Sequence, residues 1–167
     1  MKYEIAYLSL SGNAEKLAHG IADSLPHNQT LVTNLAHKRI TSKADIYIIG
    51  FGMNKGTVPI DIINTLDELQ GKRIMFFVTC GLDPSEKHQK DVEKKLFPFM
   101  PDDCDYCGLF MCRGKIPDNV VKAIYDKLIE RGDNQSAMKI LEEAALSENH
   151  PDSTDIENAC AFISKYI

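Results

Sequence analysis

The sequence has no long apolar segment. None of its hydrophobic runs approaches the roughly 20 residues that a helix needs to cross a bilayer. The first residues lead directly into a strand-like run, without the charged and apolar regions of a signal peptide. These absences argue against a membrane span and against export. We therefore expect a cytoplasmic protein.

The chain also lacks an excess of basic residues. Its 19 Lys and Arg stand against 24 Asp and Glu, which gives a formal net charge of −5. Proteins that bind nucleic acid concentrate positive charge on one surface, so we do not expect a nucleic-acid partner. An acidic surface suits docking to a basic protein through attraction that salt weakens. It also serves simply to keep a protein in solution.

Cysteines are few, and their spacing matches no complete site. Cys104 and Cys107 form a C-x-x-C pair, and Cys112 follows five residues later. A thioredoxin-type pair would open a helix after a strand, and a zinc site would need a second pair of ligands. We expect free thiols and no metal site, and leave open whether these three cysteines do any chemistry.

What the sequence does contain is an alternation of strand-like and helix-like segments. The run at residues 45–51 is continuous and β-branched, as in a central parallel strand that is covered on both faces. The 167 residues suit a single domain. The alternation predicts an α/β fold with an open parallel sheet and helices on both faces. The predicted strands are 3–8, 30–35, 45–51, 73–79 and 105–112, and the predicted helices are 14–25, 59–69, 85–97 and 154–166.

Residues 113–152 exceed what a five-stranded unit of this kind needs. Within this added segment, 117–129 and 135–146 have the spacing of two further helices. Such helices could cover an edge of the sheet or contact a partner, and covering the edge is the commoner use.

The turn between the first predicted strand and the first predicted helix has the composition of an anion site. It reads Ser9-Leu10-Ser11-Gly12-Asn13. The first N–H groups of a helix have no partner inside the helix, and the helix dipole is positive there. The serines add hydroxyl donors, and Gly12 allows the backbone to come close. No Walker loop or G-x-G-x-x-G is present, so a single phosphate fits better than a triphosphate or a dinucleotide. An ordinary capped helix after an edge strand remains the alternative.

Two further loops follow predicted strands and give the chain its likeness to a known family. They are Gly52-Met53-Asn54-Lys55-Gly56-Thr57 and Thr79-Cys80-Gly81-Leu82-Asp83. Together with the first turn, these loops make the sequence resemble the flavodoxin family over residues 1–112 and the last helix. The resemblance implies a three-layer α/β/α sandwich whose five parallel strands have the order 2-1-3-4-5, with the added helices after the fifth strand.

The resemblance also implies a non-covalent FMN. Its phosphate would be held by Ser9, Leu10, Ser11, Gly12 and Asn13, and its ring would lie between the loops at 52–57 and 79–83. Ala14 departs from the family, because many members carry a hydroxyl at this position that also bonds the phosphate. The absence of that hydroxyl should weaken phosphate binding. Many members also stack Trp or Tyr on the ring. This chain has no Trp, so Met53 is the natural substitute, and one face of the flavin should be exposed.

These features lead us to expect an electron-transfer protein that passes electrons from FMN to a partner reductase. The alternative is an FMN-dependent NAD(P)H:quinone-type reductase that uses the exposed flavin face directly. We see no separate catalytic residues, which favours the carrier. A second alternative is a flavin-free α/β regulatory or interaction module. A receiver domain, however, would need an Asp at the end of the third strand, where Phe51-Gly52 stands.

Overall fold

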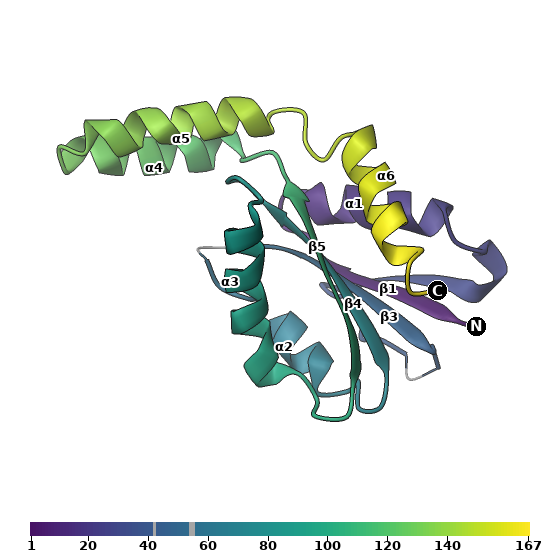
Figure 1. The fold of residues 1–167 in the computed structure, drawn as a ribbon. Coiled ribbons are helices and arrows are strands. Elements are labelled where there is room, and N and C mark those ends of the chain that lie inside the picture. The colour runs from purple at the N-terminus through teal and green to yellow at the C-terminus, as the bar shows by residue number, and fades with distance from the viewer. Residues whose placement is uncertain (42, 54–55) are drawn as a thin grey trace.

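The protein is built on one sheet of five parallel strands with the order β2-β1-β3-β4-β5 (Figure 1). The computed structural model describes residues 1–41, 43–53 and 56–167. The expected fold class and strand order are confirmed. The central strands are buried because helices cover both faces, which is why they read as continuous apolar runs. The strands are β1 (Tyr3–Leu8), β2 (Thr30–Asn34), β3 (Ile46–Gly52), β4 (Arg73–Cys80) and β5 (Asp105–Arg113).

Two helices cover each face of the sheet. On one face, α1 (Asn13–Asp23) and α6 (Ser153–Ile163) pack on a core that includes Ile5 and Tyr7. On the other face, α2 (Ile60–Leu66) and α3 (Glu86–Leu96) cover a core that includes Ala6 and Leu8. Successive residues of β1 thus supply opposite cores, as the alternation of side chains along a strand requires. Short 3₁₀ turns are η1 (His27–Gln29) and η2 (Phe97–Phe99).

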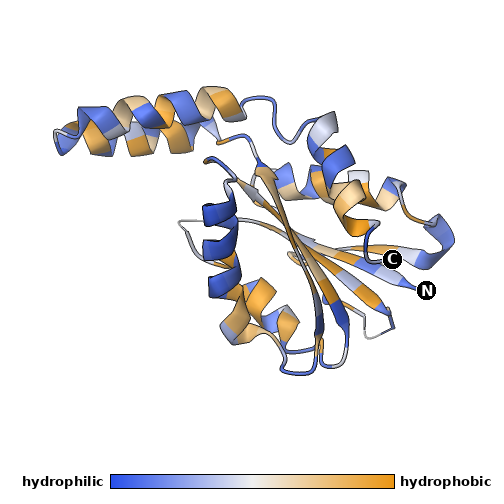
Figure 2. Ribbon diagram, viewed as in Figure 1, coloured by the Kyte–Doolittle hydropathy of each residue, from blue (hydrophilic) through white to orange (hydrophobic). Residues whose placement is uncertain are grey.

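The hydropathy of these elements follows their positions. Apolar residues gather on the strands, whereas α3 is almost wholly hydrophilic along its length (Figure 2). Of its residues, Val92 and Leu96 are buried, so α3 anchors itself to the sheet through one narrow stripe. None of the helices in the described part of the chain is both long and apolar enough to cross a bilayer.

The added segment forms a helical hairpin of α4 (Asp118–Glu130) and α5 (Asn134–Ser147). Figure 1 shows this hairpin starting beside the carboxyl ends of the strands and extending away from the sheet. It therefore does not lie along the lateral edge of the sheet, which we expected as the commoner use of such helices. The reason is that α4 and α5 pack against each other. No residue of α4 is buried, and α5 buries Ala137 and Ser147.

Three strands, β3, β4 and β5, end one residue later than predicted. Gly52 belongs to β3 and Cys80 to β4, so both lie in the sheet and not in the following loops. The register explains this, because Gly52 pairs with Thr79, and Cys80 pairs with Arg113 at the end of a lengthened β5.

Candidate functional site

The three loops singled out in the sequence meet at one end of the sheet, beside the carboxyl ends of the strands. They follow β1, β3 and β4, which are neighbours, so their carboxyl ends come together. The pairing of Leu8 with Phe51 and of Gly52 with Thr79 fixes their relative heights. In open α/β sheets this end is where ligands bind. Asn54 and Lys55 of the middle loop lie outside the described residues.

The loop after β1 leads into α1 through a left-handed residue. Gly12 has a φ of 85° and has open space where a side chain would stand. No side chain caps the helix. The first helical bond runs from the Lys16 N–H to the Gly12 carbonyl at 3.0 Å, so the earlier amides point out of the helix start. The loop therefore presents backbone donors at the positive end of α1.

Ser9 supplies the most telling atom of this loop. Its Oγ is buried and has no hydrogen-bond partner among the described residues. A buried hydroxyl without a hydrogen-bond partner destabilises a protein by about 1–3 kcal/mol, so such hydroxyls are rare in native structures. Neighbouring side chains turn to solvent, with Leu10 81% exposed and Ser11 also exposed. The loop is thus exposed to solvent beside a Ser9 hydroxyl that lacks a hydrogen-bond partner among the described residues.

Asn13 makes two contacts in the structure. Its Nδ2 donates to the Oγ of Ser11 at 3.0 Å and to the backbone carbonyl of Lys115 at 2.9 Å. The role of this amide in holding a phosphate therefore stays a prediction, because its hydrogens already have acceptors. Ala14 is buried in the core beneath α1.

The loop after β3 is tied to the end of β4. The Met53 N–H donates to the Thr79 carbonyl at 3.0 Å, and the Met53 side chain packs partly buried against the core of the α2 face. Gly56 has a φ of 73°, and its carbonyl accepts from Lys95 Nζ at 2.6 Å. Thr57 is exposed beside it.

The end of β4 and the loop that follows it combine buried and exposed groups of the site. Thr79 and Cys80 are buried, whereas Leu82 is 50% exposed and Asp83 also faces solvent. Burial raises the pKa of the Cys80 thiol to about 12. The Cys80 Sγ donates to the Leu82 carbonyl at 3.2 Å. At neutral pH this thiol stays protonated and unreactive.

A flavodoxin-domain family model matches residues 4–164. The chain belongs to the flavodoxin domain family. Two curated relatives are flavodoxin-like domain-containing proteins BilS. The one from Clostridioides difficile is 28% identical and covers 97% of this chain and 94% of the relative. The one from Clostridium symbiosum is 26% identical and covers 93% of this chain and 90% of the relative.

A solved flavodoxin and a solved flavoprotein share the fold. Two-electron reduced Megasphaera elsdenii flavodoxin has a TM-score of 0.53 and 17% identity, and the match covers 70% of this chain and 89% of that one. A Lactobacillus acidophilus flavoprotein in complex with FMN has a TM-score of 0.53 and 15% identity, and the match covers 66% and 92% of the two chains. These likenesses concern the fold.

A further group of residues borders these loops, and the sequence pattern did not indicate it. They lie at 113–116, at the root of the added segment, and on α5. Gly114 donates its N–H to the Cys80 carbonyl at 2.8 Å, and Ser147 donates its hydroxyl to the Gly81 carbonyl at 2.9 Å. No periodicity marks a serine on a helix as a neighbour of a distant loop. The glycine directly after the fifth strand was the one available signal.

The cysteines of the C-x-x-C pair are free thiols in the structure. Cys104 and Cys107 are half-buried and Cys112 is buried. Burial raises the pKa of all three thiols. All three thiols therefore stay protonated at neutral pH, and none is set up as a thiolate nucleophile.

Within the described part of the chain, one group of side chains has metal-ligand spacing: His150, Asp152 and Asp155. These residues form the start of α6. Asp152 accepts from the Asp155 N–H, and Asp155 Oδ2 accepts from the Asp152 N–H and lies 2.6 Å from His150 Nδ1. Their capping bonds account for the cluster.

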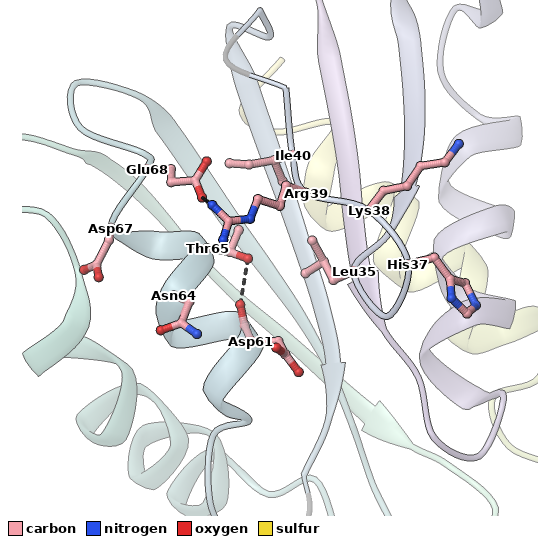
Figure 3. Close-up of a pocket in the computed structure, with 10 residues that line it drawn as sticks. All are labelled: Leu35, His37, Lys38, Arg39, Ile40, Asp61, Asn64, Thr65, Asp67 and Glu68. Carbon is pink, nitrogen blue, oxygen red and sulfur yellow. Dashed lines mark hydrogen bonds and ion pairs between the residues drawn. The ribbon is translucent and has the colours of Figure 1, made fainter.

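A cavity of about 470 Å³ lies away from the three loops. It opens between the connection after β2 and helix α2 (Figure 3). Arg39 and Glu68 approach to 3.8 Å across it, and both are exposed at the surface. None of the described residues of the three loops lines this cavity, and the charged side chains around it are of both signs. It is therefore a surface groove apart from the candidate site. Its lining is Leu35, His37, Lys38, Arg39, Ile40, Asp61, Asn64, Thr65, Asp67 and Glu68.

Proposed function

We propose that this protein binds FMN without a covalent bond and carries electrons to a partner protein in the cytoplasm. The buried Ser9 hydroxyl, which has no partner among the described residues and lies in the loop that leads from β1 to α1, is the observation that carries the proposal. A phosphate oxygen is the acceptor that such a hydroxyl and the neighbouring amides would satisfy. The solved Lactobacillus acidophilus flavoprotein, which shares the fold, holds FMN.

The residues of the first loop fit a phosphate. None of residues 9–14 is charged. Glu15 is the acidic residue of the first turn of α1, and its carboxylate accepts the Tyr7 hydroxyl at 2.8 Å. This bond directs the carboxylate toward β1. Ser9, Leu10, Ser11, Gly12, Asn13 and Ala14 would line the phosphate through hydroxyls and backbone amides.

The other two loops would hold the flavin ring. Bound FMN supplies the redox chemistry by taking up electrons together with a proton and giving them up again. The protein binds and orients it. Met53 would pack against the ring through its thioether, and Leu82 would leave the outer side accessible to a partner. The full set is Gly52, Met53, Asn54, Lys55, Gly56 and Thr57, with Thr79, Cys80, Gly81, Leu82 and Asp83.

A flavin titration of the flavin-free protein tests the cofactor. Hydrogen bonds to a charged phosphate contribute about 1.5–3 kcal/mol each, so FMN should bind at least about 10-fold more tightly than riboflavin. Flavin fluorescence and the visible absorbance of the complex give both dissociation constants. Equal affinities would assign the phosphate no role. A protein that binds neither flavin would point to an α/β interaction module.

Steady-state turnover separates a carrier from a self-sufficient reductase. With FMN loaded, we expect the isolated protein to turn over NADH or NADPH with quinones at less than about 1 s⁻¹, below the ordinary enzyme range. The net charge of −5 favours a basic docking surface on the partner, so electron transfer to that protein should slow as salt is added. Turnover of roughly 1–10³ s⁻¹ without a second protein would instead establish an NAD(P)H:quinone-type reductase.

A further inference from the structure

The segment after β5 runs between two of the three loops and is bonded to both. At the first loop, Asn13 Nδ2 donates to the Lys115 carbonyl at 2.9 Å. At the end of β4, where the next loop begins, the Gly114 N–H donates to the Cys80 carbonyl at 2.8 Å. A side chain at Gly114 would lie 2.6 Å from Asn13 Nδ2. The root of the α4–α5 hairpin is therefore fitted closely between these loops.

The carboxyl end of α5 holds the loop after β4 from the other side. Ser147 is completely buried, although serine is mostly exposed in proteins. Its hydroxyl donates to the Gly81 carbonyl at 2.9 Å. Ile116 fills the space beside Gly81, where a Cβ would come within 2.5 Å of its side chain. Gly81 is thus fixed between a hydrogen bond from α5 and an apolar contact from the hairpin root.

An ion pair joins the end of β5 to α5 beside the same loop. Arg113 Nη1 lies 2.6 Å from Glu143 Oε2, and each side chain is only 14% exposed. The other guanidinium nitrogen, Nη2, lies 3.7 Å from Asp83 Oδ1. Because Glu143 fixes the guanidinium in a partly buried setting, Arg113 presents a stationary positive charge to Asp83.

We propose that Ser147 and Glu143 are positioning residues of the flavin site. They set the backbone of residues 80–83, which would face the flavin ring, so α5 tunes the affinity and the midpoint potential of the cofactor without touching it. This inference rests on the proposed function. It makes the α4–α5 hairpin a part of the cofactor site.

The test uses full-length Ser147→Ala and Glu143→Gln. Hydrogen–deuterium exchange of the flavin-free variants should be faster at residues 81–83, and exchange in the central strands should stay unchanged. FMN should bind about 3- to 10-fold more weakly, because Ser147→Ala removes the hydrogen bond to the Gly81 carbonyl and Glu143→Gln removes the negative charge that fixes Arg113. The midpoint potential of the bound flavin should shift from that of the wild type.

Matched controls come from the opposite end of the same sheet. Ser24→Ala removes a hydroxyl bond to the Ile21 carbonyl at 2.7 Å. Asp105→Asn breaks the pair between Asp105 and Arg73, whose Oδ2 and Nε lie 2.7 Å apart at the start of β5. Both should leave FMN affinity and midpoint potential at wild-type values. Glu143→Asp, which keeps the charge, should recover more affinity than Glu143→Gln.

The outcomes separate the two proposals. If the wild type binds FMN and both variants keep its affinity and potential, the positioning role is wrong. The same holds if exchange at 81–83 rises while affinity and potential do not move, since the contacts are then merely structural. Should Ser147→Ala fail to fold, the nearly isosteric Glu143→Gln decides alone. A wild type that binds no flavin contradicts the proposed function itself.

Discussion

Ser11→Asp is expected to weaken FMN binding by at least about 100-fold, because it places a carboxylate where the proposed function needs donors. A carboxylate and a phosphate are both negative, and two like unit charges about 4 Å apart repel each other by roughly 4 kcal/mol in a partly exposed setting. That is about three orders of magnitude in affinity. The exposed position of Ser11 means that the fold should tolerate the change. An acidic group near the start of α1 even interacts favourably with the helix dipole.

Riboflavin provides the internal control for this variant, since it has the ring but not the phosphate. Its affinity should change by no more than about threefold, or roughly 0.7 kcal/mol. Asn134→Asp adds the same charge in the exposed first turn of α5, and this turn lies at the tip of the hairpin, away from the sheet (Figure 1), so the change should leave both affinities as they are. Isothermal or fluorescence titrations at one fixed ionic strength measure the dissociation constants of both variants for both flavins, and the wild-type constants are the reference. An equal loss of FMN and riboflavin would mean that Ser11 acts on the ring or on folding.

The fold could be predicted because its signals are local. The buried run at 45–51 reads as a central strand on its own, and the turn from Ser9 to Asn13 marks the junction of a strand with a helix. Because the strands are parallel, the loops that follow them then lie together at the carboxyl end of the sheet. The end points of β3 and β4 were less accessible, because pairing with a neighbouring strand, and not composition, carries Gly52 and Cys80 into the sheet.

The rest of the site depends on contacts between distant residues. The partner of Asn13 is a backbone carbonyl 102 positions later, and a carbonyl leaves no mark in the sequence. The spacing of apolar residues predicted α4 and α5 as helices. It could not indicate whether their apolar stripes meet the sheet or each other, because both arrangements use the same periodicity. The hydrogen bond from Ser147 to the Gly81 carbonyl likewise joins residues 66 positions apart, so the sequence alone carries no sign of it.

Gly50→Ala is expected to cause the largest loss of stability of any single methyl group added to β3. Gly50 lies in the middle of that strand, and a Cβ there would come within 1.8 Å of the Phe77 ring. Phe77 is 1% exposed and belongs to the core beneath α1, so its ring has no solvent into which it could turn. Overpacking a core of this kind costs about 1–3 kcal/mol and occasionally more. We expect about 3 kcal/mol.

Urea denaturation of the flavin-free protein measures this loss, with the midpoint falling while the slope against urea stays constant. Gly52→Ala is the matched control in the same strand. Its Cβ would meet no atom closer than 3.4 Å, so stability should stay within about 0.5 kcal/mol of the wild type. Phe77→Leu should partly rescue Gly50→Ala, because the smaller side chain vacates the space that the methyl group needs. Losses that simply add in the double variant would show that Gly50 and Phe77 are not coupled, and that the strand absorbs the methyl group by shifting its backbone.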